Sequence, residues 1–343
     1  MRANVLTDWK VLAMRDVPAP KPGPGQALIE VVYAGICGSD VTVFNHRHPT
    51  ATIPRIMSHE VLGIVREINS DEKLSYGVGS RVAAFPLSYC GKCDPCRDGN
   101  FHVCTDLKIM GLHVDGGFAE YVAVDVEKLF PVAESVPDRI AILAEPLAVG
   151  FHANARACTE PGDTVLVIGA GPIGILCAMC AQHFEAGKVV LAEINPERVA
   201  LARSFGFDVI DSRTDAMAEI LAHTDGKGFD KVFEASGSQA GAMMIASAAK
   251  IRGVVVPIGI PYQAMPYETG KIILKEQYII GSRVHTLKHF GRAVGMLERF
   301  HARGTFDLDR MIAATYPLEE LAEGIAMQES GKYNGKILIN VKA

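Results

Sequence analysis

The sequence predicts two domains of different classes: a mainly β domain, and an α/β domain whose parallel sheet carries helices on both faces. The chain has 343 residues, which is long for one compact core and comfortable for two. Residues 1–130 contain short β-branched runs broken by Gly and Pro, a rhythm typical of an all-β domain. From about Pro161 onward, apolar runs alternate with helix-like runs, and this alternation indicates a parallel sheet.

The individual elements follow this division. In the first region, strands are expected at Gln26–Ala34, Val61–Ile68, Arg81–Pro86 and Phe118–Val124. In the alternating region, strands are expected at Thr164–Ile168, Val189–Glu193, Phe229–Gly237 and Val254–Ile260, with helices after the first strand and at Pro196–Gly206. The last segment predicts helices at Leu287–Gly304 and Pro317–Ser330 and a strand at Lys336–Val341. Because the alternating unit is complete without this tail, we expect the tail to return to the first domain, which gives residues 1–152 with 286–343 and residues 153–285.

Composition and charge exclude several classes of partner. The chain is 49% hydrophobic and 21% charged, as in ordinary globular proteins, and its net charge of −5 does not support a nucleic-acid or anionic-membrane surface. The N-terminal residues lack an apolar signal-peptide core, and the longest uncharged apolar stretch, Val165–Ala181, is too short to span a bilayer. We therefore expect a cytoplasmic protein with no membrane or nucleic-acid partner.

Four of the eight cysteines fall within a 15-residue stretch, the cysteine loop, as Cys90, Cys93, Cys96 and Cys104. A disulfide framework is not typical of a chain of this length that has no export signal. An iron–sulfur cluster would need an electron-transfer context, which the sequence lacks. Four convergent thiolates suit a closed structural Zn²⁺ site. By contrast, Cys177, Cys180 and Cys158 are expected to be ordinary small core residues.

A glycine-rich turn follows the strand Thr164–Ile168 and precedes a helix. In Gly169-Ala-Gly171-Pro-Ile-Gly174, the first glycine permits the tight turn, the second the approach of a pyrophosphate, and the third close packing of helix and strand. Glu193 lies about 20 residues further on, where a carboxylate binds ribose hydroxyls and repels a 2′-phosphate. The turn predicts a Rossmann domain that binds NAD, although Arg198 leaves open a contact with the adenosine.

A second candidate metal site combines residues that are distant in the sequence. Cys37, His59, Glu60 and Glu145 together offer a thiolate, an imidazole and carboxylates, a set able to hold a Zn²⁺ with an exchangeable position. Asp40 could accept a hydrogen bond from His59 and fix its tautomer. Taken singly, Cys37 and His59 could equally be core residues, and the sequence does not give their geometry.

The motifs GICGSD, HE, the cysteine loop, DGGFAEY, EPLAV and GAGPIG occur here in the order found in zinc-dependent medium-chain dehydrogenases. The whole chain resembles that family, particularly its sorbitol, threonine and sugar-acid dehydrogenase branch. The resemblance implies a GroES-like β domain built from both ends of the chain, with a Rossmann domain between them. It also implies two zinc ions per chain and a homo-oligomer, either a dimer or a tetramer.

The resemblance assigns roles to individual residues. Cys37, His59 and Glu145 would hold the catalytic zinc, Glu60 would alternate with water as a further ligand, and Ser39 would relay the proton. The implied nucleotide contacts, together with the glycine-rich turn itself, are Gly169, Gly171, Pro172, Ile173, Gly174, Glu193, Arg198, Ile258, Gly259, Ile260, Ser282 and Arg283. Two positions depart from the family pattern: Thr42 stands where many relatives have histidine, and Ser58 where most have glycine.

The expected reaction is the reversible NAD-linked oxidation of a secondary alcohol to a ketone, with zinc polarising the alcohol oxygen. The segments PR-x-x-x-HE, GxHxDGGFAEY and GSR are similar to the sugar-acid branch, which favours an aldonate over a neutral polyol and then threonine. Arg55 and Arg283 could face a substrate carboxylate or could form ordinary salt bridges. Two rival functions stay open: a zinc-free reductase on the same fold, and a zinc protein that senses a nucleotide without catalysis.

Overall fold

The computed structural model describes residues 1–213, 216–261 and 263–342, and the chain divides into two compact units. The first unit comprises residues 1–145 and residues 286 to the C-terminus, and the second comprises residues 146–285. The first boundary falls inside helix α4 (Ala144–Ala157), and the sequence-based boundary after residue 152 lies further along the same helix. Ala343, the end of the expected range, lies outside the described residues.

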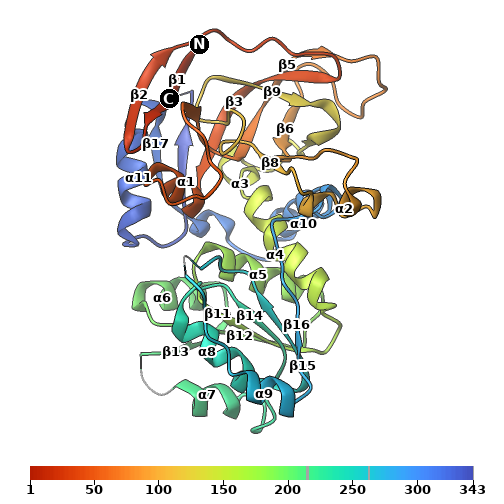
Figure 1. Ribbon diagram of the computed structural model, residues 1–343, viewed down its shortest axis with the longest axis vertical. Helices are drawn as coiled ribbons and strands as arrows, with labels where there is room; N and C mark the ends of the chain where they lie inside the picture. Colours follow the sequence, from red (N-terminus) through yellow and green to blue (C-terminus); the bar gives the residue numbers. More distant parts are fainter. Residues whose placement is uncertain (214–215, 262, 343) are drawn as a thin grey trace. The chain divides into compact units, whose positions relative to one another are not determined.

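The main sheet of the first unit joins both ends of the chain. Its strand order is β10–β6–β5–β3–β18–β17, and β9 also pairs with β3. The strands are β3 (Gln26–Ile36), β5 (Glu60–Asn69), β6 (Arg81–Ala84), β9 (Tyr121–Asp125), β10 (Leu129–Pro131), β17 (Ile312–Pro317) and β18 (Lys336–Asn340). The last strand, β18, therefore pairs with β3 from the N-terminal part of the chain, and red and blue segments meet in Figure 1.

Smaller elements complete the first unit. A second sheet has the order β2–β1–β4, and a third pairs β7 with β8. These strands are β1 (Arg2–Asp8), β2 (Val11–Asp16), β4 (Arg55–Ile56), β7 (Leu87–Ser88) and β8 (Lys108–Ile109). The helices are α1 (Gly38–Phe44), α2 (Asp94–Arg97), α3 (Asp138–Ala141), α10 (Leu287–Arg303) and α11 (Leu321–Ser330), with short 3₁₀ turns at Phe101–Val103, Val126–Lys128, Leu308–Met311 and Leu318–Glu320.

The second unit is a parallel sheet whose strands alternate with helices along the chain. Its strand order is β13–β12–β11–β14–β15–β16, so the order reverses on either side of β11, as in Rossmann folds. The strands are β11 (Thr164–Ile168), β12 (Lys188–Glu193), β13 (Asp208–Asp211), β14 (Phe229–Glu234), β15 (Ala249–Pro257) and β16 (Tyr278–Ile279). The helices are α5 (Pro172–His183), α6 (Pro196–Ser204), α7 (Ala216–Ala222), α8 (Gln239–Ala248) and α9 (Thr269–Leu274). The predicted fold class, a Rossmann domain and a separate β domain, is confirmed.

Each unit has its own apolar core, and the burial of its strands explains their sequence pattern. In β11, Val165, Leu166 and Val167 are fully buried, because a parallel sheet covered on both faces leaves no polar side. In β3, alternate residues such as Ala27, Ile29 and Val31 are buried, as expected for a sheet packed on one face. Cys177 and Cys180 are buried inside α5, where burial raises the pKa of the Cys177 thiol, so both are core residues as expected. The same expectation was wrong for Cys158, which is exposed just after the end of α4.

Candidate metal centres and nucleotide site

The cysteine loop brings its four sulfur atoms together without a disulfide. Its ligand atoms all lie within 4.8 Å of one another, and Cys104 Sγ lies 3.5 Å from Cys90 Sγ and 3.8 Å from Cys93 Sγ. Zinc–sulfur bonds of about 2.3 Å in a tetrahedron place neighbouring sulfurs about 3.8 Å apart, so the spacing fits Zn²⁺. All eight cysteines of the chain are free thiols.

Backbone N–H groups prepare the loop for anionic sulfur. The amides of Cys90 and Asp106 each donate to Cys104 Sγ at 3.3 Å. Hydrogen bonds from the backbone of Thr105 and Cys96 lower the pKa of Cys93 to about 6, which favours its thiolate at neutral pH, whereas burial raises the pKa of Cys96 to about 12. The loop therefore supplies both the donor atoms and the local polarity that a thiolate-bound cation requires.

The second group, here named the Cys37 cluster, consists of Cys37, His59 and Glu60. Their ligand atoms lie within 4.8 Å of one another, although the three residues come from the start of α1, the segment before β5, and β5 itself. His59 and Glu60 are buried, yet His59 Nδ1 and Glu60 Oε2 have no hydrogen-bond partner within the described part of the chain. Buried polar atoms are rarely left unsatisfied, so these donors fit a metal ion.

The electrostatics of the Cys37 cluster also favour a cation. Burial by itself lowers the pKa of His59, but a hydrogen bond with the Cys37 side chain and the nearby acidic groups of Cys37, Glu145 and Asp40 outweigh burial and raise that pKa well above its ordinary value. Burial raises the pKa of Glu60, and the nearby carboxylate of Glu145 raises it further. Glu145 is thus electrostatically coupled to His59 and Glu60 without being part of the compact group.

Asp40 connects the two segments that carry the ligands. Its Oδ2 accepts the backbone N–H of Cys37 at 2.8 Å, and its Oδ1 accepts that of Ser58 at 3.1 Å. The sequence suggested a hydrogen bond from His59 to Asp40, but His59 Nδ1 has no hydrogen-bond partner among the described residues, and the two oxygens of Asp40 bind backbone amides instead. Asp40 therefore positions both ligand-bearing backbones rather than the imidazole ring.

The residues that depart from the family pattern have clear local structures. Ser58 adopts a φ of 76°, a left-handed conformation that explains why relatives use glycine there, and its hydroxyl donates to the carbonyls of Gly35 and Glu60. The Thr42 hydroxyl donates to the carbonyl of Gly38 at 2.9 Å. The hydroxyl of Ser39 is buried and has no hydrogen-bond partner among the residues described, so it can still accept or donate one.

In the second unit, the glycine-rich turn has the geometry that the sequence predicts. Gly169 has a φ of 97°, and a Cβ on Gly174 would lie 1.9 Å from the carbonyl oxygen of Gly169, so only glycine fits at both positions. By contrast, a Cβ on Gly171 would meet nothing closer than Arg198 Nη1 at 4.0 Å, which leaves space at this point of the turn. Helix α5 starts here at Pro172, with Gly171 as its N-cap, and the first turn of a helix has free N–H groups that suit a phosphate.

The Glu193 carboxylate is buried and holds the same turn. Its Oε2 accepts the N–H of Ala170 at 2.8 Å, and its Oε1 accepts those of Ile194 and Asn195 at 2.8 and 2.9 Å. Each carboxylate oxygen can accept about two hydrogen bonds, so one acceptor position is left on Oε2. Glu193 therefore stabilises the turn, and one of its acceptor positions is not used by these bonds.

The other expected nucleotide contacts lie along the same edge of the sheet. The amides of Ile258 and Gly259 donate to the carbonyl of Glu234, whereas Ile260 is 85% exposed. Arg283 is also exposed, and the buried hydroxyl of Ser282 has no hydrogen-bond partner within the described residues.

Comparison with known proteins decides the family. Residues 23–134 match the family model of the alcohol dehydrogenase GroES-like domain, and residues 172–299 match that of the zinc-binding dehydrogenase. The chain is 32% identical to L-galactonate-5-dehydrogenase of Escherichia coli K12, over 94% of both chains. It is 32% identical to L-threonine 3-dehydrogenase of Chelativorans sp. BNC1, over 96% of this chain and 95% of that one. This chain belongs to the zinc-dependent medium-chain dehydrogenase family.

A solved structure supports the same assignment. A zinc-binding dehydrogenase from Sinorhizobium meliloti 1021, solved bound to NADP, superposes with a TM-score of 0.91 at 29% identity, covering 99% of this chain and 98% of that one. The present dehydrogenase is therefore an oxidoreductase of the zinc-dependent alcohol dehydrogenase type. Within the described residues, none of its helices combines the length and apolar character needed to cross a bilayer.

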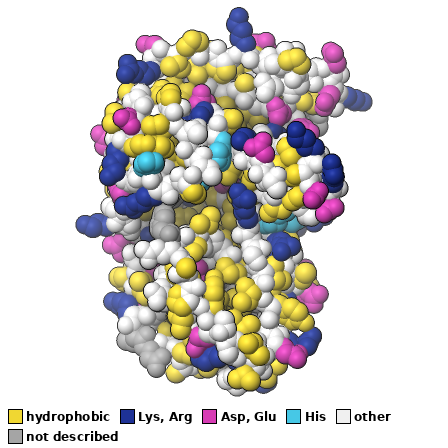
Figure 2. Space-filling model, in the orientation of Figure 1, with side chains coloured by type: hydrophobic (Ala, Val, Ile, Leu, Met, Phe, Trp, Pro, Cys, Tyr) yellow, Lys and Arg dark blue, Asp and Glu magenta, His cyan; other side chains and the backbone are white. Residues whose placement is uncertain are grey.

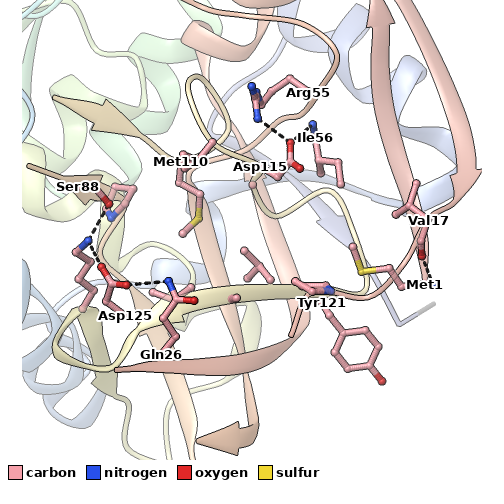
Figure 3. Close-up of a pocket in the computed structure, with 18 of the residues that line it drawn as sticks. Met1, Val17, Gln26, Arg55, Ile56, Ser88, Met110, Asp115, Tyr121 and Asp125 are labelled. Atoms are coloured by element: carbon pink, nitrogen blue, oxygen red, sulfur yellow. Dashed lines mark hydrogen bonds and ion pairs between the residues drawn. The ribbon is translucent and has the colours of Figure 1, made fainter. Parts of the chain in front are cut away.

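Arg55 of this dehydrogenase is engaged in an ion pair. Its guanidinium binds Asp115 Oδ1 at 3.0 Å and the hydroxyl of Thr52 at 2.9 Å, and Figure 3 shows it turned toward Asp115. Asp115 also accepts the N–H of Ile56, so the pair closes the wall of a mostly apolar cavity of about 540 Å³ in the first unit. This corresponds to the salt-bridge alternative for Arg55 rather than to a substrate contact.

Sequence reasoning missed two charged residues of the dehydrogenase. Glu234 is buried at the end of β14, where its Oε1 accepts the N–H of Ser236 at 2.9 Å and that of Gly237 at 3.1 Å. It therefore shapes the loop that packs against Gly169, where a Cβ would lie 2.9 Å from the amide nitrogen of Ser236. Lys336 is buried beside Glu60. A carboxylate at the end of an apolar strand, such as Glu234, could have been recognised from the sequence as a candidate site residue. A lysine at the start of the last strand, such as Lys336, carries no such signal.

Proposed function

We propose that this dehydrogenase catalyses the reversible NAD-linked oxidation of a secondary alcohol to a ketone, and that the Cys37 cluster is its catalytic metal site. The observation that supports this most strongly is the cluster itself, in which two buried atoms, His59 Nδ1 and Glu60 Oε2, have no hydrogen-bond partner within the described residues. A purely structural protein would gain nothing from burying such a set, since unsatisfied buried polar atoms are destabilising.

Four side chains would hold the catalytic zinc: Cys37, His59 and Glu145, with Glu60 as the ligand that exchanges with water. When bound, zinc supplies Lewis acidity toward the alcohol oxygen, and the nicotinamide accepts a hydride from the carbon. The protein contributes orientation, because Asp40 holds the backbones on both sides of the ligands through its bonds to Cys37 and Ser58. The cysteine loop would hold a second, structural zinc.

The proton released from the alcohol is proposed to leave through Ser39. Its hydroxyl is buried, lies two residues from Cys37 and has no protein partner within the described residues, so it can accept a proton from the substrate while donating its own onward. Thr42 lies three residues further along α1, and its hydroxyl donates to the carbonyl of Gly38. The balanced reaction converts alcohol and NAD⁺ to ketone, NADH and one proton.

For the substrate, we propose a sugar acid oxidised at an internal carbon. The similarity to a galactonate dehydrogenase over nearly the full chain supports this, and so do the PR-x-x-x-HE and GSR segments. A neutral polyol and L-threonine are the second candidates, the latter because a threonine dehydrogenase is equally similar. Arg55 adds no support, since it is paired with Asp115.

The proposed cofactor is NAD rather than NADP, because the buried carboxylate of Glu193 would repel a 2′-phosphate. The experiment that tests substrate and cofactor together is a panel of aldonates, polyols, simple alcohols and threonine, each assayed with NAD and with NADP by absorbance of the reduced nicotinamide. We expect the highest kcat/KM with an aldonate and NAD. Higher values with threonine or with NADP would replace the corresponding part of the proposal.

A nucleotide-sensing zinc protein without catalysis is the alternative from another class. The two functions differ in metal content and turnover: we expect two zinc ions per chain and measurable oxidation, whereas a sensor would need only the zinc of the cysteine loop. A zinc-free reductase would contain no zinc. Metal analysis of the purified protein therefore separates all three functions.

We further propose a cytoplasmic homo-oligomer. All eight cysteines are free, which suits a reducing compartment. Apolar side chains are exposed on the edge strand β16, on the preceding helix α9, and on β15 and the segment that follows it: Ile251, Ile260, Ile273, Leu274, Tyr278 and Ile279. Figure 2 shows hydrophobic side chains in this region of the second unit. An exposed apolar sheet edge favours pairing with a second copy, so Ile279→Lys should lower the molar mass measured by light scattering.

A further inference from the structure

Lys336, at the start of the last strand, is buried against the Cys37 cluster. It is 5% exposed, and its Nζ donates to Glu60 Oε1 at 2.5 Å and to the carbonyl of Ile36 at 2.9 Å. Glu60 is 1% exposed, and its other oxygen, Oε2, has no hydrogen-bond partner in the described chain. One oxygen of this carboxylate is therefore bound by a lysine and the other is available.

The pair spans three strands, and a glycine makes this possible. Glu60 lies opposite Gly35 on β3, and Gly35 lies opposite Leu338 on β18, two residues from Lys336 on the same face. Strands are spaced about 4.8 Å apart, so Glu60 and Lys336 must meet above β3. A Cβ on Gly35 would lie 1.9 Å from Glu60 Oε2, so any other residue would block the carboxylate.

The charges explain why this pairing bears on the metal. Without Lys336, Glu60 would be a buried carboxylate whose nearest compensating cation is the metal held by Cys37 and His59. It would then turn both oxygens toward that ion and occupy the position that an alcohol oxygen needs. With Lys336 in place, Oε1 of the Glu60 carboxylate is bound to the lysine of β18 and is kept away from the metal.

We propose that Lys336 is a positioning residue that holds the Glu60 carboxylate back across Gly35, so that the Cys37 cluster keeps an exchangeable position for the substrate oxygen. This proposal rests on the proposed function of the cluster as a catalytic metal site. It also assigns a role to the C-terminal strand, which supplies the restraining cation from 276 residues away in the sequence.

The test is Lys336→Met in the full-length zinc-loaded protein, measured by zinc release to a chromogenic chelator. Two zinc ions should give two release phases. In the Cys37→Ser variant only the zinc of the cysteine loop should remain, so this variant identifies the phase that serves as an internal reference. Zinc release from the cluster should slow about tenfold and kcat should fall about tenfold with an unchanged KM for NAD, as expected for a residue that orients a metal ligand. The visible spectrum of the Co²⁺-substituted variant should show an added ligand.

Three further variants make the result decisive. Lys336→Arg keeps the cation and should restore the wild-type release rate, and the double variant Lys336→Met with Glu60→Gln should lose the slow release. Lys336→Gln keeps polar hydrogen-bonding atoms in the side chain but loses the cation, and should slow release even if Lys336→Met does not fold. Unchanged or faster release in both Lys336→Met and Lys336→Gln would overturn the role of Lys336. A wild-type protein with zinc in the cysteine loop alone would instead overturn the proposed function.

Discussion

The cysteine loop draws its four sulfurs from 15 consecutive residues, whereas the Cys37 cluster collects its side chains from separate parts of the first unit and is flanked by a lysine from the last strand. The loop is held by amides of neighbouring residues, such as those of Cys90 and Asp106. The cluster is held by Asp40 and by the strands of the main sheet. One group depends on local chain geometry and the other on the whole fold.

The difference matches the chemistry expected of each group. Four like thiolates fill a tetrahedral shell, and a closed shell stabilises the loop without offering a position to a substrate. The Cys37 cluster mixes a thiol, an imidazole and a carboxylate, and two of its atoms, His59 Nδ1 and Glu60 Oε2, have no hydrogen-bond partner among the described residues. A site that must exchange a ligand needs restraint from outside the ligand set, which Asp40 and Lys336 can supply.

The largest expected effect comes from breaking the Cys37 cluster alone. Cys37→Ala should reduce kcat by at least about 10³-fold, because metal polarisation supplies several kcal/mol of transition-state stabilisation. The fold should be retained, since Cys37 is only half buried and lies at the start of α1. The measurement is steady-state NADH formation, together with zinc content and thermal unfolding.

Its matched control is Cys158→Ala, which removes an exposed thiol that belongs to neither metal group. That variant should keep both zinc ions and normal turnover. Normal activity in Cys37→Ala would refute the assignment of the catalytic site, whereas a loss of both zinc ions would show that the two groups depend on each other.

A smaller effect is expected from the proton path of the same cluster. Ser39→Ala should lower kcat about 10²-fold, as is usual for the loss of a positioned proton-transfer group, while zinc content stays at two per chain. Thr42→Val removes the second hydroxyl of α1, which donates to the carbonyl of Gly38, and its kcat is compared with that of Ser39→Ala. Equal losses in both variants would indicate a two-hydroxyl relay, and an unchanged kcat in Ser39→Ala would remove Ser39 from the mechanism.

Breaking the cysteine loop should affect stability rather than chemistry. Cys93→Ser removes the thiolate whose pKa is lowered to about 6 by backbone N–H groups. We expect loss of one zinc and a decrease in melting temperature of roughly 5–10 °C, because structural zinc contributes directly to folding free energy. The turnover of the folded fraction should stay close to wild type. Loss of turnover at temperatures where the variant is still folded would contradict a purely structural role.

The same contrast explains how far the sequence could predict the structure. The cysteine loop and the glycine-rich turn are local, so spacing alone indicates the convergence of Cys90 with Cys104 and the tight turn at Gly169. The alternating strands were likewise predicted, because covered parallel strands read as continuous apolar runs. In these cases neighbouring residues determine the geometry.

Long-range pairings were not accessible in this way. The bond between Lys336 and Glu60 depends on three strands and on Gly35, and no local pattern marks it. Asp40 was expected to bind the His59 ring but binds two backbone amides, because its side chain reaches the turn before β5. Arg55 could have faced a substrate, but Asp115 occupies its guanidinium. Side-chain partners that arrive from distant segments require the fold.

The smallest expected effect concerns the glycine-rich turn, which, like the cysteine loop, is held by hydrogen bonds to nearby backbone amides. Glu193→Ala removes three hydrogen bonds to the backbone at 2.8–2.9 Å and the charge that would repel a 2′-phosphate. The KM for NAD should rise about tenfold, equivalent to roughly 1.4 kcal/mol, and the preference for NAD over NADP should decrease.

Glu193→Gln separates the two causes, because it keeps the side-chain length and one acceptor oxygen but loses the charge. If loss of the charge is what improves kcat/KM with NADP, Glu193→Gln should show the same improvement as Glu193→Ala. Its KM for NAD should rise less, because the side chain can still accept a hydrogen bond. Unchanged kinetics with both cofactors in Glu193→Ala would mean that the ribose is bound elsewhere and that Glu193 serves the turn alone.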